Sequence, residues 1–203
     1  MATICIFGDS ITWGASDTEG GGWVTRLRNF YESEGLPVDQ DVDVYNLGVS
    51  GDNTDDLLKR FDIETEAREP STILFAIGIN DSQFIISKGE NRISESLFQK
   101  NLEVLFAKAK ALTSKVAFIG LIVVDESKTI PIPWNTDENY TKENRDRYDS
   151  VIRKLCTKNH IPYLDMDEVV SIGDLSDGLH PNTTGHKKMF EAVRNFLKSE
   201  NLV

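Results

Sequence analysis

Short runs of apolar, largely β-branched residues alternate along this chain with longer segments in which apolar residues recur every three or four positions. The short runs predict buried strands, and the longer segments predict amphipathic helices. Because the runs are almost continuously apolar, we expect an α/β fold with a mostly parallel, five-stranded sheet that is covered by helices on both faces. The predicted strands are Thr3–Phe7, Val42–Asn46, Thr72–Ile77, Val116–Val124 and Pro162–Asp165.

Apolar stripes at helical spacing predict four helices between and after these strands. The first helix ends near Gly35, and the second begins near Ser94. A shorter helix is predicted over Asn53–Phe61, with Asn53 or Thr54 as its N-cap. The stripes are Trp23, Leu27, Phe30 and Tyr31; Leu97, Leu102, Leu105, Phe106, Ala109 and Leu112; Tyr148, Val151, Ile152 and Leu155; and Met189, Phe190, Val193, Phe196 and Leu197.

Composition limits the classes of protein to consider. Hydrophobic residues make up 39% of the 203 residues and charged residues 27%, which is typical of a folded globular protein. No repeat or linker-like segment divides the chain, so we expect a single domain over residues 1–203. The 22 basic and 33 acidic side chains give a net charge of −11 without any basic run, which argues against nucleic acid and anionic membranes as partners.

The N-terminal segment lacks the basic and apolar regions of a signal peptide, and no apolar stretch reaches the roughly 20 residues that span a bilayer. We therefore expect a cytoplasmic protein without membrane insertion. The two cysteines, Cys5 and Cys156, fall in a predicted strand and a predicted helix, and their spacing is not that of a metal site or a CxxC motif. We expect both to be reduced thiols with a structural role.

Candidate chemistry gathers at the ends of the predicted strands. In open α/β sheets, ligands bind beyond the carboxyl ends of the strands. Three strands lead into polar segments at that edge, and a fourth polar segment precedes the last helix. These segments are Gly8-Asp9-Ser10, Gly48-Val49-Ser50-Gly51, Gly78-Ile79-Asn80-Asp81 and Asp177-Gly178-Leu179-His180-Pro181.

A hydroxyl nucleophile needs a base near neutral pH, and histidine is the usual one. His160 is predicted to be an exposed helix cap, and His186 to be solvated in the first turn of the last helix. His180 follows Asp177 by three residues, so the carboxylate can accept a hydrogen bond from one ring nitrogen and leave the other free to take a proton. The same pair could instead be a clasp that only closes a loop.

Ser10 is the candidate nucleophile because it directly follows a strand and can begin a helical turn whose backbone N–H groups face the site. Gly-Asp-Ser on its own is also common in ordinary turns. Gly51 lets its backbone N–H approach closely because it has no side chain, and Asn80 offers an amide NH₂, so both are candidate donors to an oxyanion. Each could also be an ordinary turn residue.

Together, the four segments resemble the four sequence blocks of the SGNH, or GDSL-type, hydrolases in order and spacing. The resemblance spans residues 8–181 and implies a three-layer α/β/α sandwich with a flavodoxin-like sheet, without a metal or an organic cofactor. It also implies that Ser10 is the nucleophile, that His180 is the general base and that Asp177 orients the imidazole. The oxyanion hole would comprise the backbone N–H groups of Ser10 and Gly51 and the side-chain amide of Asn80.

This resemblance implies hydrolysis of a carboxylic ester through an acyl-enzyme, with a short acyl or acetyl group on a small molecule or sugar. Trp13 and Trp134 are candidate pocket residues, and Trp134 lies in the long loop Asp125–Glu138. Trp134 could equally be a surface aromatic residue held by its own loop. This loop and a second long loop, Ser82–Ile93, could each equally be a surface insertion. The acidic composition favours neutral over anionic esters. An acyltransferase with the same residues and a non-catalytic flavodoxin-like binding module are the alternatives.

Overall fold

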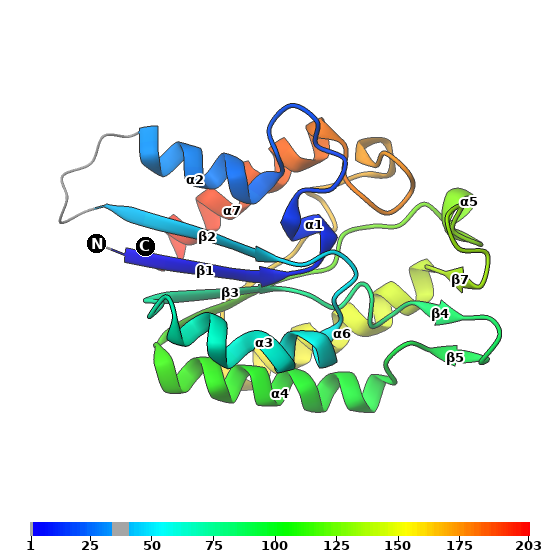
Figure 1. The fold of residues 1–203 in the computed structure, drawn as a ribbon, viewed down its shortest axis with the longest axis horizontal. Helices are drawn as coiled ribbons and strands as arrows, with labels where there is room; N and C mark the ends of the chain where they lie inside the picture. Colours follow the sequence, from blue (N-terminus) through cyan, green and yellow to red (C-terminus); the bar gives the residue numbers. More distant parts are fainter. Residues whose placement is uncertain (1, 34–40) are drawn as a thin grey trace.

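The computed structural model describes residues 2–33 and 41–203. Its central sheet has five strands, all parallel, in the order β2-β1-β3-β6-β8 (Figure 1). This is the strand order of a flavodoxin-like sheet, so the predicted fold class is confirmed. The strands are β1 (Ala2–Gly8), β2 (Val42–Gly48), β3 (Thr72–Ala76), β6 (Lys115–Ile119) and β8 (Tyr163–Leu164).

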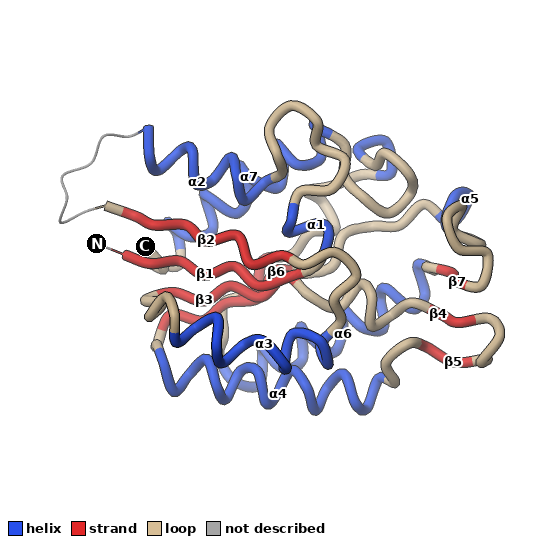
Figure 2. Tube along the Cα trace, viewed as in Figure 1, coloured by secondary structure: helices blue, strands red, loops and turns tan. Residues whose placement is uncertain are grey.

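Helices cover both faces of this sheet and form the two outer layers (Figures 1 and 2). Helices α2 and α7 pack together on one face, and α3, α4 and α6 cover the other. The layers form because each helix turns an apolar stripe towards strands that are apolar on both sides. These helices are α2 (Trp23–Ser33), α3 (Thr54–Glu66), α4 (Glu95–Leu112), α6 (Lys142–Asn159) and α7 (Thr183–Ser199).

The N-caps that define the helix starts agree with the sequence. The Ser94 side chain accepts a hydrogen bond from the backbone N–H of Leu97 at the start of α4. Asn53 accepts one from Asp56 at the start of α3, so Asn53 is the N-cap of the two predicted alternatives. The predicted end of the first helix near Gly35 lies outside the described residues.

The predicted strand Val116–Val124 is too long. Strand β6 ends at Ile119, and the Gly120 N–H still donates to the Leu164 carbonyl of β8 at 2.9 Å. From Leu121 onwards the residues are mostly buried but do not pair with a strand. The backbone N–H of Leu121 donates to the Asp149 carboxylate at 2.8 Å, and the Arg145 guanidinium donates to main-chain carbonyls of the same segment. Side chains of α6 therefore replace a neighbouring strand as hydrogen-bond partners, and the apolar pattern predicted burial rather than sheet structure.

Two smaller differences concern the ends of elements. Strand β8 comprises only two of the four residues predicted for it. On α4, Leu97 and Leu112 at the ends of the predicted stripe are exposed, whereas Leu102 and Leu105 in its middle are fully buried. The buried face of this helix instead runs from Phe98 to Ala109, so the predicted stripe is offset from the true one at both ends.

A second, small sheet lies beyond the carboxyl ends of the central strands (Figure 1). It is antiparallel, in the order β5-β4-β7, and it joins the two long connections that the sequence predicted as loops. Strands of two residues have no hydrophobic period, so the sequence could not reveal them. The elements are β4 (Phe84–Ile85), β5 (Glu90–Asn91), β7 (Glu138–Asn139) and the neighbouring short helix α5 (Glu126–Thr129).

The two cysteines belong to the core. Cys5 on β1 and Cys156 on α6 are both buried, and both are free thiols. Burial raises the pKa of each thiol to about 12, so both stay protonated at neutral pH. The predicted structural role is confirmed.

Candidate active site

The three central strands end side by side. In the register of the sheet, Gly8 of β1 lies opposite Gly48 of β2 and Ala76 of β3. Because these strands are parallel, the segments that follow them leave the sheet at the same edge. The predicted nucleophile and the two predicted oxyanion donors lie on these segments.

Ser10 is the first residue of the short helix α1 (Ser10–Trp13), and Asp9 is the N-cap of that helix. The Asp9 carboxyl group accepts a hydrogen bond of 2.9 Å from the backbone N–H two residues further on. A Cβ atom at Gly8 would lie 2.1 Å from the Thr12 hydroxyl, so only glycine fits there. This close packing fixes the turn between β1 and α1 and holds Ser10 in a nearly buried position.

His180 links Ser10 to Asp177. The Ser10 Oγ lies 2.9 Å from the Nε2 of His180, and the Nδ1 of His180 lies 2.7 Å from the Oδ2 of Asp177. The other carboxylate oxygen accepts hydrogen bonds from the backbone N–H groups of Leu179 and His180, at 3.0 and 2.8 Å. The structure thus brings the three predicted residues into one hydrogen-bonded row, and the same carboxylate also closes the loop.

The Asp177 carboxylate is ionised at neutral pH. Its partial burial would raise its pKa, but hydrogen bonds from the His180 ring and from backbone N–H groups lower this pKa to about 2. An ionised carboxylate only accepts hydrogen bonds, so the ring proton of His180 is held at Nδ1. The lone pair of Nε2 then faces the Ser10 hydroxyl and can accept its proton.

Gly51 and Asn80 follow the two neighbouring strands. Gly51 has a φ of 84°, the left-handed region that favours glycine, and a Cβ there would meet no atom within 4 Å. Glycine is therefore favoured at position 51 by the backbone conformation, and not because a side chain would clash with a neighbouring atom. Within the described part of the chain, the backbone N–H groups of Ser10 and Gly51 donate no hydrogen bond, and Asn80 uses one amide hydrogen, which it donates to the Asp52 carbonyl at 2.9 Å.

Two buried carboxyl groups support these segments, and the sequence reasoning did not select them. Asp81 accepts hydrogen bonds from the backbone N–H of Thr54, at 3.1 Å, and from its hydroxyl, which ties the segment after β3 to the start of α3. Burial raises the pKa of Asp9 and that of Asp81 to about 7. Their direct adjacency to Ser10 and Asn80 in the sequence was the available signal.

The prediction that His186 is solvated is wrong. It is fully buried, and its Nδ1 accepts a hydrogen bond of 3.3 Å from the Trp23 N–H while its Nε2 lies 2.8 Å from the Ala15 carbonyl. Trp23 begins α2, where backbone N–H groups have no partner within their own helix, and the imidazole satisfies one of them. Burial lowers the pKa of His186. His160 is the exposed C-cap of α6, as predicted.

The two tryptophans of the predicted pocket differ in their surroundings. The centroid of the Trp134 ring lies 5.8 Å from that of His180, and 53% of Trp134 is exposed, so a ligand at Ser10 can contact this ring. Trp13 is exposed at the end of α1, three residues after Ser10. Trp134 therefore lies beside the hydrogen-bonded row in space, whereas Trp13 is placed near Ser10 only by its position in the sequence.

The chain matches the GDSL-like Lipase/Acylhydrolase family over residues 6–188. This region is nearly the whole chain, and it includes the strand ends, the serine and the histidine described above. The protein belongs to the GDSL-like lipase/acylhydrolase family. Lipases and acylhydrolases cleave acyl esters, so the chain is a carboxylic ester hydrolase of the GDSL type.

Three proteins illustrate what this GDSL-type hydrolase is similar to. The uncharacterized protein YpmR of Bacillus subtilis is 23% identical to it, covering 98% of this chain and 82% of YpmR. The crystal structure of the lipase/acylhydrolase from Enterococcus faecalis has a TM-score of 0.79 at 24% identity and covers 98% and 97% of the two chains. Axe2, an acetylxylan esterase from Geobacillus stearothermophilus, has a TM-score of 0.74 at 18% identity and covers 97% and 94%. At these identities, the two structures show a shared fold.

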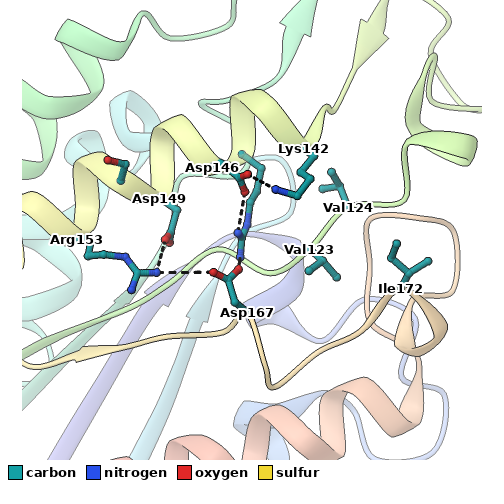
Figure 3. A pocket seen from close by; sticks show the side chains of 10 residues that line it. Val123, Val124, Lys142, Asp146, Asp149, Arg153, Asp167 and Ile172 are labelled. Atoms are coloured by element: carbon teal, nitrogen blue, oxygen red, sulfur yellow. Dashed lines mark hydrogen bonds and ion pairs between the residues drawn. The ribbon is translucent and has the colours of Figure 1, made fainter.

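A surface pocket of about 470 Å³ in this GDSL-type hydrolase is lined by none of the candidate site residues (Figure 3). Arg145 pairs with Asp146 at 3.0 Å and with Asp167 at 2.5 Å, and Arg153 pairs with Asp149 at 3.1 Å. Because these charges pair with one another, we interpret the cluster as an ion-pair network that holds α6 to the segment before α7.

Residues 2–33 and 41–203 show neither a membrane-spanning helix nor a cluster of metal ligands. None of the helices there combines the length and the apolar content needed to cross a membrane. The same residues contain no group of three or more His, Cys, Asp or Glu side chains arranged to hold a metal ion.

Proposed function

We propose that the chain hydrolyses its ester in two steps, through an acyl-enzyme formed on Ser10. The observation that carries this proposal is the hydrogen-bonded row from the Ser10 hydroxyl through His180 to the ionised Asp177. In this row His180 takes the hydroxyl proton, and Asp177 stabilises the charged ring that results.

In the first step, the Ser10 Oγ attacks the carbonyl carbon of the ester while its proton passes to the Nε2 of His180. The electron pair of the carbonyl moves onto oxygen and gives a tetrahedral oxyanion. When this intermediate collapses, the bond to the leaving alcohol breaks and His180 returns the proton to the alcohol oxygen. A water molecule, deprotonated by His180, then attacks the carbonyl carbon of the acyl-enzyme. The bond to Ser10 Oγ breaks, His180 returns the proton to Oγ, and the acid is released.

Three N–H groups stabilise the oxyanion in this proposal. They are the backbone N–H groups of Ser10 and Gly51 and the second amide hydrogen of Asn80. Support comes from their availability, since within the described residues none of the three donates to another group of the protein. Donors that are already in place favour the transition state because no reorganisation is needed when the negative charge develops.

We further propose a neutral ester with a short acyl group, carried by a small molecule or a sugar, as the substrate. The exposed Trp134 ring beside His180 offers a flat apolar surface of the kind that sugar and aryl rings pack against. The net charge of −11 disfavours anionic substrates. The similar fold of Axe2, an acetylxylan esterase, agrees with an acetylated sugar.

Hydrolysis of p-nitrophenyl esters of increasing acyl length, followed by a panel of O-acetylated sugars, tests the proposal. We expect the wild-type enzyme to prefer short acyl groups, and Ser10→Ala, which removes only the hydroxyl, to show no turnover above background. Hydrolysis by Ser10→Ala at the wild-type rate would overturn the assignment. Product analysis with an added acceptor alcohol distinguishes hydrolysis from the alternative, acyl transfer. A hydrolase releases the free acid, whereas an acyltransferase forms a new ester with the acceptor.

A further inference from the structure

The orientation of the Asn80 amide decides whether it can stabilise an oxyanion. Its Oδ1 accepts a hydrogen bond of 2.7 Å from the Tyr140 hydroxyl, and its Nδ2 donates to the Asp52 carbonyl at 2.9 Å. The oxygen and the nitrogen of an amide have nearly the same size, so shape alone does not distinguish the two orientations. In the reverse orientation, Asn80 would present an oxygen to the developing oxyanion and repel it.

Tyr140 is part of a longer series of hydrogen bonds. Its hydroxyl oxygen accepts a hydrogen bond of 2.9 Å from the Nε2 of Gln83, and the same Nε2 donates to the Oε2 of Glu138 at 2.7 Å. We call Glu138, Gln83 and Tyr140 the orienting chain. It connects the small sheet, through Glu138 on β7, to Asn80 at the end of the central sheet.

The carboxylate at the start of the orienting chain gives it a single direction. A carboxylate has no hydrogen to donate, so Gln83 has to turn its NH₂ group, and not its oxygen, towards Glu138. The second hydrogen of that NH₂ group then points to the Tyr140 oxygen, and the hydroxyl proton of Tyr140 is left to point to the Oδ1 of Asn80. The NH₂ group of Asn80 is thereby directed away from Tyr140.

Burial protects this arrangement from competition with water. Asn80, Gln83 and Tyr140 are each no more than 5% exposed. Burial raises the pKa of Tyr140, and the carboxylates of Asp9 and Glu138 raise it further, so the phenol keeps its proton and acts as a donor. The reverse orientation of Gln83 would place its oxygen against the Glu138 carboxylate and the Tyr140 oxygen, which is strongly unfavourable in such surroundings, whereas the observed orientation leaves the Gln83 Oε1 without a partner among the described residues.

The backbone around Tyr140 is fixed as well. Its N–H donates to the Thr129 carbonyl at 3.1 Å, and the Thr129 hydroxyl donates to the Tyr140 carbonyl at 2.6 Å. Strand β7, which immediately precedes Tyr140, pairs with β4, which immediately follows Gln83. The two long connections therefore hold the orienting chain from both sides.

We propose that Glu138, Gln83 and Tyr140 orient the Asn80 amide so that it presents N–H to the oxyanion, and that the two long connections serve catalysis in this way. Tyr140 is then a positioning residue, which acts through Asn80 and does not touch the substrate. This inference rests on the proposed function, because it assigns a task to one of the proposed oxyanion donors.

The first test is Tyr140→Phe with p-nitrophenyl acetate as substrate. A single oxyanion donor is worth about 10²–10³ in kcat, and Tyr140→Phe leaves the amide in place, so we expect a loss of about tenfold in kcat with little change in KM. In an Asn80→Ala background, the same change should have no further effect, because the group it orients is gone. Tyr163→Phe, which removes a hydroxyl bonded to the Asp149 carboxylate, is the matched control with unchanged kcat.

The second test reverses the orienting chain without changing its charge or size. In the double variant Gln83→Glu/Glu138→Gln, the new carboxylate at position 83 accepts a hydrogen bond from the Tyr140 hydroxyl, so the tyrosine no longer donates to Asn80. We expect kcat to fall at least as far as in Tyr140→Phe, while thermal unfolding confirms that the variant is folded. A purely structural role for these residues does not predict a loss that depends on direction.

The outcomes separate this inference from the proposed function. Any one of three results would overturn the orienting role and leave the hydrolase mechanism intact. The first is wild-type kcat in a folded Tyr140→Phe enzyme, and the second is a full further loss of kcat when Tyr140→Phe is added to Asn80→Ala. The third is full activity of the Gln83→Glu/Glu138→Gln variant. Absence of ester hydrolysis by the wild-type protein overturns the proposed function itself, and the orienting role with it.

Discussion

His180 and His186 lie six positions apart, yet they are held by different kinds of partner. His180 lies between the Ser10 hydroxyl and the Asp177 carboxylate, and part of its side chain is exposed. His186 is fully buried between two backbone groups of the opposite end of the chain, one donor and one acceptor. The two rings therefore offer a comparison between a reactive and a structural histidine within one loop-to-helix segment.

The partners give the two rings opposite tautomers. The Asp177 carboxylate only accepts, so the Nδ1 of His180 carries the proton and its Nε2 lone pair faces a hydroxyl. The Trp23 N–H only donates, so the Nδ1 of His186 carries the lone pair and its Nε2 donates to a carbonyl. A backbone amide does not give up its proton near neutral pH, whereas a serine hydroxyl does so in an acyl transfer. The group that faces the lone pair thus decides which ring can act as a base.

Asp177→Asn should have the largest effect, because it pushes His180 towards the tautomer of His186. Asparagine can present its NH₂ group to Nδ1, which moves the ring proton to Nε2 and removes the lone pair that faces Ser10. We expect kcat for p-nitrophenyl acetate to fall about 10⁴-fold, while the midpoint of thermal unfolding changes little. A loss of less than about tenfold in a folded variant would contradict the role given to this tautomer.

His186→Ala should change stability rather than catalysis. The substitution leaves the Trp23 N–H and the Ala15 carbonyl without their partner and opens a cavity between α2 and α7. We expect the free energy of unfolding, measured with urea, to fall by about 2–4 kcal/mol. The kcat of the folded fraction should stay close to the wild-type value, and His186→Gln, which can both donate and accept, should recover part of the stability. A loss of kcat like that of a Ser10 variant would remove the distinction between the two histidines.

Trp134→Ala tests the solvent-exposed surroundings of His180, because His186 is fully buried and has no exposed ring beside it among the described residues. The Trp134 ring lies beside the His180 ring and is open to solvent, so its removal takes apolar contact from the ligand and not from the core. We expect KM for an aryl ester to rise about threefold to tenfold with little change in kcat, which corresponds to about 1 kcal/mol of binding. Unchanged KM for aryl and sugar esters alike would exclude this ring from substrate binding.

The smallest expected effect is a contribution of His186 to the pH dependence of stability. Burial lowers the pKa of His186 below its ordinary value of 6.5, so the unfolded chain binds more protons there than the folded one as the pH falls through that value. The free energy of unfolding should therefore fall as the pH is lowered below about 6.5. Asp9 and Asp81 have the opposite sign, because their raised pKa of about 7 favours the folded state as the pH falls.

The contribution of the histidine is isolated as the difference between wild type and His186→Gln in urea unfolding from pH 7.5 to 5.5. Both proteins contain the two buried carboxyl groups, so their contribution cancels in the comparison. A difference that stays constant over this range would show that His186 does not titrate on unfolding.

The fold and the hydrogen-bonded row were predictable for physical reasons. Strands that are covered on both faces leave continuous apolar runs, and in such sheets ligands bind beyond the carboxyl ends of the strands. Ser10 could therefore be found from its position after a strand, and His180 from the carboxylate three residues before it.

The surroundings of His186 were not predictable in the same way. Its two hydrogen-bond partners lie 163 and 171 positions away in the sequence, so the local pattern of a polar helix start beside lysines gave the wrong environment. The orienting chain is similar, because Gln83 and Tyr140 meet only through strands of two residues. Contacts made by tertiary packing leave no period in a single sequence.

Labelling with a fluorophosphonate probe, located by peptide mass spectrometry, tests the central claim most directly. The account predicts one adduct, on Ser10, formed at the wild-type rate in His186→Gln and strongly slowed in His180→Gln. An adduct on another residue, or equal labelling rates in the two histidine variants, would contradict it.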